Sequence, residues 1–151
     1  GPRRLRGGGH PAYVIYMDNK QDNKQTETIP EYGNTAMENH QIAHGAAAVL
    51  AGRAAEYIEE HYTEKFSLDE MAEALFVNKI YLAKSFKQAT GDTLLHYHNR
   101  TRCAHAASLL RETDMSAEII GSNVGYVTPS HFARVFRSIY GCSPTEYRRS
   151  I

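Results

Sequence analysis

The sequence predicts an all-α protein from about residue 46 onward, built on two helix-turn-helix hairpins and preceded by a largely irregular segment. Three observations lead to this prediction. Apolar residues recur with a helical period, and no convincing strand pattern appears after residue 40. Serine and glycine residues stand where the periodic stretches begin and end. The pattern of one hairpin returns about fifty residues later.

Residues 1–45 differ in composition from the rest of the chain. They contain a glycine run at residues 7–9 and a polar stretch at residues 18–28, and only residues 12–17 read as a possible strand. Such a segment cannot bury a hydrophobic core by itself. We therefore predict that residues 1–45 form a tail or the remnant of a preceding regulatory domain, and that residues 46–151 form the folded domain.

The first hairpin is preceded by a helix and opens with a cap. Ala54, Ile58 and Tyr62 recur at helical spacing and mark the inner side of a helix that starts in the forties. Ser67 and Glu70 fit a capping box, in which the serine hydroxyl accepts the amide of the third helical residue. A short helix should therefore run over residues 68–75.

A second helix completes this hairpin, and a longer one follows it. The apolar period restarts with Leu82 and Phe86, and Gly91 suits the left-handed position just after a helix end. The longer helix is opened by Asp92 or Thr93 and should continue to about residue 110.

The second hairpin carries equivalent signals. Its expected caps and ends, in chain order, are Ser116, Gly125, Thr128 or Ser130, Gly141 and Ser143. Pro144 follows the last of these, and proline suits the first position of a helix.

The two hairpins look like copies. At an offset of fifty residues, Lys84 matches Arg134 and Lys87 matches Arg137. At the same offset Phe76-Val77 matches Tyr126-Val127, whereas the capping serines match at forty-nine, so one residue differs within the connecting turn. Unrelated hairpins would share capped ends, but they would not share basic residues at the same exposed positions.

In a helix-turn-helix the second helix enters the major groove of DNA. With Leu82 and Phe86 inside, the outer side of the first such helix carries Ile80, Ala83, Lys84 and Lys87. The outer side of the second carries Ser130, Ala133, Arg134 and Arg137. Lys84 and Arg134 are long enough to reach guanine O6 and N7, and Arg134 can do so with two hydrogen bonds.

Three stretches carry a family resemblance. They are Met71-Ala72 with Tyr81-Leu82 and residues 86–91, then Val124-Gly125-Tyr126 with residues 131–137, and finally residues 141–148. Through them, residues 54–149 resemble the DNA-binding domain of the AraC/XylS family of transcriptional regulators.

The resemblance implies a seven-helix domain in which a linker helix, at about residues 93–110, joins two helix-turn-helix subdomains. Recognition helices at about residues 79–90 and 129–140 would enter successive major grooves. Carried over by position, the base-contact candidates are Ile80, Ala83, Lys84, Pro129, Ser130 and Arg134. The phosphate-contact candidates are Lys87, Thr93, Arg137, Ser143, Thr145 and Arg148.

Some positions depart from the family pattern. Gly121 stands where alanine is common, which weakens a helix by ~1 kcal/mol. His105 replaces a frequent arginine. Lys84 stands where arginine is usual, and an ammonium cannot read guanine with two parallel hydrogen bonds as a guanidinium does.

Net charge and cysteine content narrow the function only a little. The formal net charge is zero, but an acidic stretch at residues 56–73 precedes a basic one at residues 79–87. The charge of each local surface, and not the total, therefore decides whether a polyanion is attracted to it or repelled from it. Cys103 and Cys142 are far apart and fit neither a zinc motif nor a disulfide framework. No apolar run approaches the ~20 residues that cross a bilayer.

The eight histidines raise the question of a metal site. His98 and His105 would lie about 10 Å apart along one helix, and His40 and His44 have no evident third ligand. We therefore expect no metal. No phosphate loop or nucleophile motif appears, so we also expect no catalytic residue, no cofactor and no enzymatic activity.

The function predicted is that of a bacterial transcriptional regulator acting in the cytoplasm, at the nucleoid. Double-stranded DNA is the expected partner, with RNA polymerase as a second partner, and activation is favoured by the resemblance alone. An effector-binding domain is expected to be absent or truncated, because fewer than fifty residues precede the domain. The alternative is a helical protein-interaction module without DNA binding, for which Lys84 and Arg134 would be dispensable.

Overall fold

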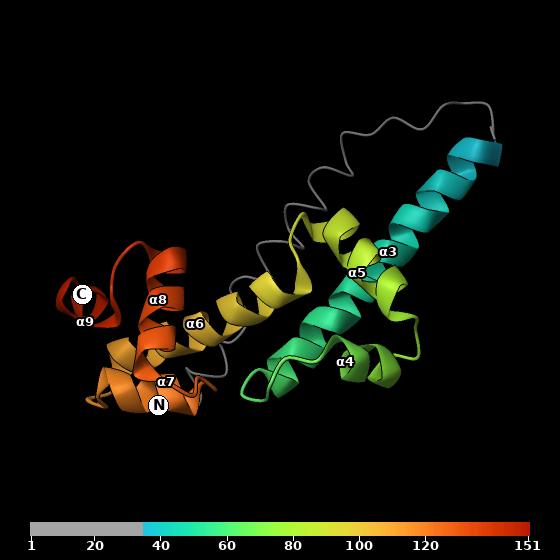
Figure 1. The fold of residues 1–151 in the computed structure, drawn as a ribbon. Helices are drawn as coiled ribbons and strands as arrows, with labels where there is room; N and C mark the ends of the chain where they lie inside the picture. Colours follow the sequence, from blue (N-terminus) through green and yellow to red (C-terminus); the bar gives the residue numbers. More distant parts are fainter. Residues whose placement is uncertain (1–34) are drawn as a thin grey trace. The chain divides into compact units, whose positions relative to one another are not determined.

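The computed structural model describes the backbone of residues 35–151 and the side chains from residue 44 onward. These residues form seven helices and no strand (Figure 1). The helices are α3 (Thr35–His61), α4 (Leu68–Ala74), α5 (Lys79–Thr90), α6 (Leu94–Glu112), α7 (Ala117–Asn123), α8 (Pro129–Tyr140) and α9 (Pro144–Arg149). The predicted all-α class, with two helix-turn-helix units and a linker helix between them, is confirmed. The possible strand at residues 12–17 and the His40 side chain lie outside the described residues.

Two helices run further than predicted. α3 begins at Thr35, within the segment that we assigned to the tail, and continues through Gly45. α6, the linker helix, extends to Glu112 instead of ending near residue 110. Within the described part of the chain, none of these helices has the length and apolar character needed to span a membrane.

The described residues divide into two compact units. The N-terminal unit holds residues 35–57 and Ser67–Leu94, and therefore contains the first helix-turn-helix, α4 and α5. The C-terminal unit holds Ile58–Phe66 and Leu95–Ile151, and therefore contains the second, α7 and α8, together with α9 and nearly all of α6.

The N-terminal unit packs α4 and α5 together beside α3. Leu82 and Phe86 on α5 are completely buried, and Met71 on α4 is nearly so. Arg53 on α3 donates a hydrogen bond from Nη2 to the carbonyl oxygen of Leu75, at 3.1 Å, just after the end of α4. The predicted inward direction of Leu82 and Phe86 is thus confirmed.

The C-terminal unit has an aromatic core. Phe132 and Phe136 from α8 pack with Tyr126, Ile120 and Cys103. The Tyr126 hydroxyl donates to Asn99 Oδ1 at 2.7 Å, which satisfies the one polar atom of this ring. Burial raises the pKa of the Cys103 thiol to about 12, so this cysteine acts as a small apolar core residue.

The departure at position 105 has a structural explanation. His105 on α6 lies 2.6 Å from a carboxylate oxygen of Glu59, near the end of α3, and both side chains are largely buried. The Tyr62 ring stacks on the imidazole, with centroids 4.0 Å apart and the rings nearly parallel. The histidine therefore joins the end of α3 to α6 within the C-terminal unit.

Gly121 is required by its neighbour Phe132. A Cβ atom built on Gly121 would lie 2.6 Å from Cδ2 and 2.8 Å from Cγ of the Phe132 ring, which is itself buried. We expect Gly121→Ala to lower the free energy of unfolding by about 1 kcal/mol, because overpacking a core costs ~1–3 kcal/mol and better helix propensity offsets only ~1 kcal/mol. Urea denaturation followed by circular dichroism measures the difference.

Ser122→Ala is the matched control for this substitution. Ser122 is the next residue of α7 and its side chain is exposed, so alanine there improves helix propensity without entering the core. It should leave stability unchanged or slightly raised. A Gly121→Ala protein as stable as the Ser122→Ala protein would contradict the packing argument.

Candidate nucleic-acid interface

α5 presents one cationic side to solvent. The Asn78 side chain begins the helix by accepting hydrogen bonds from the amides of Ile80, at 2.8 Å, and Tyr81, at 3.2 Å. Gly91 ends it in the left-handed conformation, with φ +78°, as predicted. Because Leu82 and Phe86 are buried, the opposite side of α5 faces solvent: Ile80, Lys84 and Lys87 are exposed and Ala83 is half-buried. The predicted face of this helix is confirmed, although not its role.

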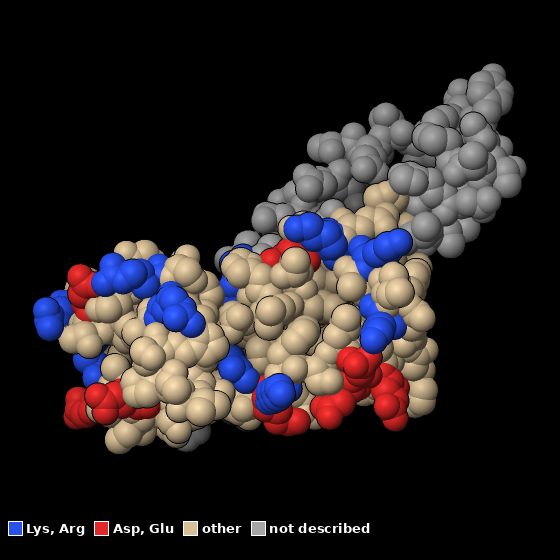
Figure 2. Space-filling view, in the orientation of Figure 1, with Lys and Arg blue, Asp and Glu red and all other residues tan. Residues whose placement is uncertain are grey.

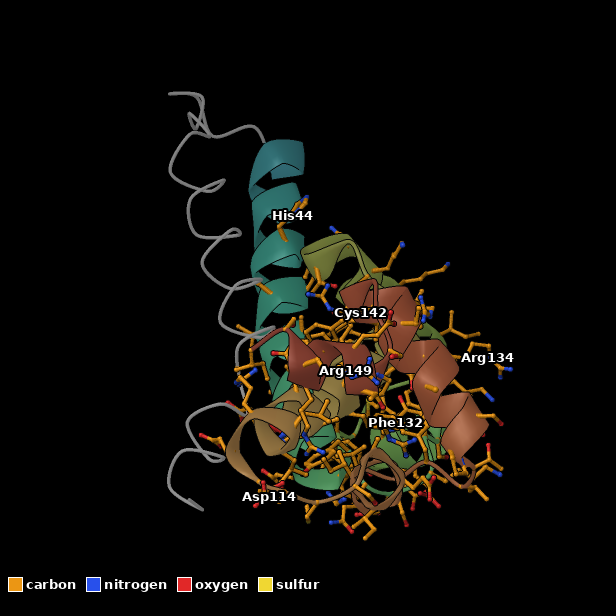
Figure 3. All side chains as sticks on the ribbon, turned by 90° about the vertical axis from the view of Figure 1, so that its left-hand side faces the viewer. His44, Asp114, Phe132, Arg134, Cys142 and Arg149 are labelled. Atoms are coloured by element: carbon orange, nitrogen blue, oxygen red, sulfur yellow. The ribbon has the colours of Figure 1, made fainter. Side chains whose placement is uncertain are left out.

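α8 repeats this arrangement. Thr128, one of the two caps that the sequence left open, accepts a hydrogen bond from the amide of His131 at 3.2 Å, and Pro129 takes the first helical position. Phe132 and Phe136 are buried. The outer side carries the exposed residues Ser130, Arg134 and Arg137, with Ala133 half-buried, and Pro129 is exposed at the start of the helix. Figure 3 shows Arg134 projecting away from the C-terminal unit, on the side of α8 away from Phe132.

The turns of the two hairpins show that one residue match in the predicted repeat was wrong. Phe76 and Gly125 both have positive φ angles, +58° and +110°. The following amides, of Val77 and Tyr126, donate to the carbonyl oxygens of Ala72 and Gly121 at 3.0 and 2.9 Å. Phe76 therefore corresponds to Gly125, and not to Tyr126 as the fifty-residue offset suggested. The extra residue of the second turn is Val127, which is 95% exposed.

Two lysines of α5 have partners within the N-terminal unit. Lys79 forms an ion pair with Asp69 of α4 at 2.9 Å, and Lys87 donates to the carbonyl oxygen of Gly91 at 3.0 Å. Both contacts are exposed, so each holds its side chain only weakly. In this unit the acidic side chains gather over α4 and the basic ones over α5 (Figure 2). A polyanion would therefore be attracted to α5 and repelled from α4.

The start of α9 gathers several phosphate-contact candidates around one carboxylate. Glu146 accepts hydrogen bonds at 2.9 Å from the Ser143 amide and from Arg137 Nη2, while the Ser143 hydroxyl accepts the Glu146 amide at 3.1 Å. The hydrogen bonds from Ser143, with the nearby Arg137 charge, lower the pKa of the Glu146 carboxyl. Thr145 is exposed beside this capping box, in which the Ser143 amide donates and the Ser143 hydroxyl accepts.

Of the two other phosphate-contact candidates, Arg148 is hydrogen-bonded to the backbone and Thr93 is exposed. The Arg148 guanidinium donates to the carbonyl oxygens of Leu110 and Thr113, each at 3.1 Å, and so ties α9 to the end of α6. These two bonds use Nε and one N–H of Nη2, so Arg148 has a structural role whether or not it also contacts phosphate. Thr93 is exposed just before α6, and its amide donates to Asp92 Oδ1 at 2.8 Å.

Sequence reasoning missed two features of this surface. Asn78 was not recognised as the cap of the first recognition helix, although asparagine is among the strongest N-cap residues and was a usable signal. The pairing of Lys79 with Asp69 depends on how α4 and α5 pack, and no local signal predicts it. Over the part of the chain that the structure describes, no three histidine, cysteine or acidic side chains gather closely enough to hold a metal ion.

Comparison with known proteins gives one consistent picture. Residues 71–150 match the family model of a helix-turn-helix domain, HTH_18. An uncharacterized HTH-type transcriptional regulator of Bacillus subtilis, YisR, is 35% identical over 102 residues, which are 68% of this chain and 36% of that protein. The HTH-type transcriptional activator RhaS of Escherichia fergusonii is 34% identical over 62% of this chain and 34% of its own length. The chain thus spans about a third of the length of these curated relatives.

A solved structure agrees in fold. A transcriptional regulator from Chromobacterium violaceum, described as containing an AraC-type DNA-binding domain, superposes with a TM-score of 0.66 and 26% identity. The match covers 70% of this chain and 95% of that one.

Proposed function

The chain belongs to the AraC-type helix-turn-helix family, and we propose that it is a sequence-specific regulator of transcription that binds duplex DNA with both recognition helices. One observation carries the proposal. The two copies of the hairpin each turn a cationic, solvent-exposed side of the second helix outward, with Lys84 and Lys87 on α5 and Arg134 and Arg137 on α8. A basic helix of this kind fits a major groove, and two of them fit successive grooves about 34 Å apart.

Within this proposal the contacts fall into two classes. Base edges would be met by Ile80, Ala83, Lys84, Pro129, Ser130 and Arg134. Phosphates would be met by Lys87, Thr93, Arg137 and Thr145. Ser143 and Arg148 stay in the phosphate class, although each also helps to cap or hold α9.

We further propose that the protein activates transcription at bacterial promoters, in the cytoplasm, by contact with RNA polymerase. The similarity to a protein named as a transcriptional activator supports activation over repression. The alternative, a helical interaction module without DNA binding, does not explain why α5 and α8 both have basic residues on their exposed sides.

Selection from random duplex DNA tests the proposal. We expect two short enriched blocks centred about 10 bp apart, bound more weakly as salt rises.

Arg134→Ala should lose the base preference of one block only, by about 1–3 kcal/mol, because a guanidinium that reads guanine O6 and N7 discriminates by that amount. Binding of matched and mismatched duplexes, measured by fluorescence anisotropy, gives the value.

Arg137→Ala is the matched control, because this neighbouring arginine is proposed to meet phosphate. It should weaken binding to all sequences about equally and leave both blocks recognisable. If Arg134→Ala behaves in the same way, Arg134 contacts phosphate. A single enriched block argues against paired reading, and no enrichment at all supports the interaction module.

A further inference from the structure

We propose that the two recognition helices read different chemistry, and that α5 recognises the C5-methyl group of a thymine through Ile80. This inference rests on the proposed function, since it assumes that α5 enters a major groove. The structural repeat provides the comparison, because the residue of α8 in the position of Ile80 is Ser130. The two half-sites would then differ in composition.

Ile80 is an apolar side chain at a solvent-exposed helix position, where polar residues are more common. It is 59% exposed, in the first turn of α5, on the side opposite to the buried Leu82 and Phe86. Isoleucine is branched at Cβ, so its side chain is held in few rotamers and loses little freedom on contact. Half-buried Ala83 lies one turn further along the same side. Together these two residues form a short apolar strip.

Two polar groups next to this strip in sequence have partners within the N-terminal unit, and the neighbouring Tyr81 side chain is 50% exposed. The amide of Ile80 donates to Asn78 Oδ1 at 2.8 Å, so it is not offered to a base. The ammonium group of Lys79 forms an exposed ion pair with Asp69 of α4. The other lysines of this side, Lys84 and Lys87, lie further toward the C-terminal end of the helix, where Lys87 donates to the Gly91 carbonyl oxygen. One side of α5, at Ile80 and Ala83, therefore presents an apolar surface, and lysines lie next to it on the same helix.

Only one exposed group in the major groove of unmodified DNA matches such a surface. Each base pair there shows hydrogen-bond donors and acceptors, and thymine alone adds a methyl group. The charge of Lys87 is complementary to a phosphate beside that base pair. We therefore expect the apolar strip to contact the methyl group of a thymine.

α8 has Ala133 in the position of Ala83 but a different group, Ser130, in the position of Ile80. Ser130 can donate or accept a hydrogen bond and so tolerates any base, while Arg134 favours guanine. Both side chains are exposed. We therefore expect a thymine to define the block read by α5 and a guanine to define the block read by α8.

The test uses the full chain and the duplex obtained by selection. Each thymine of the two blocks is replaced in turn by deoxyuridine, which lacks only the methyl group, and affinity is measured by fluorescence anisotropy. One such replacement in the block read by α5 should weaken binding about fourfold, the value of one buried methyl group. Replacements in the block read by α8 should leave the affinity unchanged.

Variants then assign the effect to Ile80. Ile80→Ala should bind the thymine and uracil duplexes equally, whereas Ile80→Val, which keeps a branched apolar side chain, should still prefer thymine. Ser130→Ala is the matched control in α8 and should keep the full preference for thymine over uracil. Thermal melting of each variant shows that it is folded.

The outcomes separate this inference from the function on which it rests. If the selected duplex is bound specifically but uracil makes no difference, the inference is overturned and the proposed function stands. Equal weakening of both duplexes by Ile80→Ala, with the thymine preference kept, also overturns it. If selection enriches no sequence, the proposed function fails and the inference fails with it.

Discussion

Replacing Arg102 with methionine is expected to lower the free energy of unfolding of the C-terminal unit by about 3 kcal/mol, since hydrogen bonds from a charged donor contribute ~1.5–3 kcal/mol each. Arg102 is on α6 and is only 7% exposed. Its Nε donates to the carbonyl oxygen of Tyr62 at 2.6 Å and its Nη2 to that of Glu64 at 2.7 Å. The guanidinium also lies 4.9 Å from the centre of the Tyr126 ring. Methionine leaves both carbonyl oxygens without this donor.

Two further variants make the result specific. Arg102→Lys keeps the charge but cannot place two donors in a planar fork, so it should recover only part of the lost stability. Arg149→Met removes an exposed arginine of α9 and should change little. Urea denaturation of the full chain, followed by circular dichroism, measures all three. Equal stability of the Arg102→Met and Arg149→Met proteins would show that the guanidinium does not hold the loop after α3.

The same guanidinium explains why residue 125 is glycine. A Cβ atom there would lie 2.7 Å from the Thr63 carbonyl oxygen and 2.8 Å from Arg102 Nη2. The φ angle of +110° is also one that side chains rarely tolerate. The turn of the second helix-turn-helix thus closes directly over the arginine and over the loop that the arginine binds, all within the C-terminal unit.

The features that the sequence predicted correctly are short-range ones. The caps at Ser67, Ser116 and Ser143 and the left-handed ends at Gly91 and Gly141 depend on hydrogen bonds within four residues. The outer sides of α5 and α8 followed from apolar period alone, because Leu82 with Phe86 and Phe132 with Phe136 each lie one helical turn apart. This is why the surface proposed to meet DNA could be outlined without coordinates.

The features that were missed are contacts between distant segments. Arg102 reads in the sequence as one more basic residue of a helix, and its acceptors are backbone carbonyl oxygens 38 and 40 residues away. Glu59 and His105 are 46 residues apart, and Arg148 reaches back 38 residues to Leu110. Carbonyl acceptors carry no side-chain signature, so a pattern of residue types cannot predict them.

Acid should destabilise the protein through His98, between pH 6.5 and about 4. His98 on α6 is 4% exposed, and its Nε2 has no hydrogen-bond partner among the described residues. Burial, and secondarily the charge of Arg102, lower its pKa from 6.5 to about 4. In this range the unfolded chain takes up a proton that the folded protein does not, so the free energy of unfolding falls as pH falls. The loss due to this residue should reach about 3 kcal/mol near pH 4 and grow no further below it.

His98→Leu is the variant that isolates this effect, because leucine has a similar volume and cannot take up a proton. The ring of Phe66 meets the imidazole edge-on, with centroids 5.3 Å apart, so an apolar side chain suits the site. Urea denaturation at intervals from pH 7 to pH 4 should show a stability profile flatter than that of the wild-type protein by the same ~3 kcal/mol. His96→Leu, which alters an exposed histidine of the same helix, should keep the wild-type profile. If His98→Leu and the wild-type protein lose stability in parallel over this range, the acid sensitivity arises elsewhere, and the imidazole of His98 is protonated equally well in the folded and the unfolded chain.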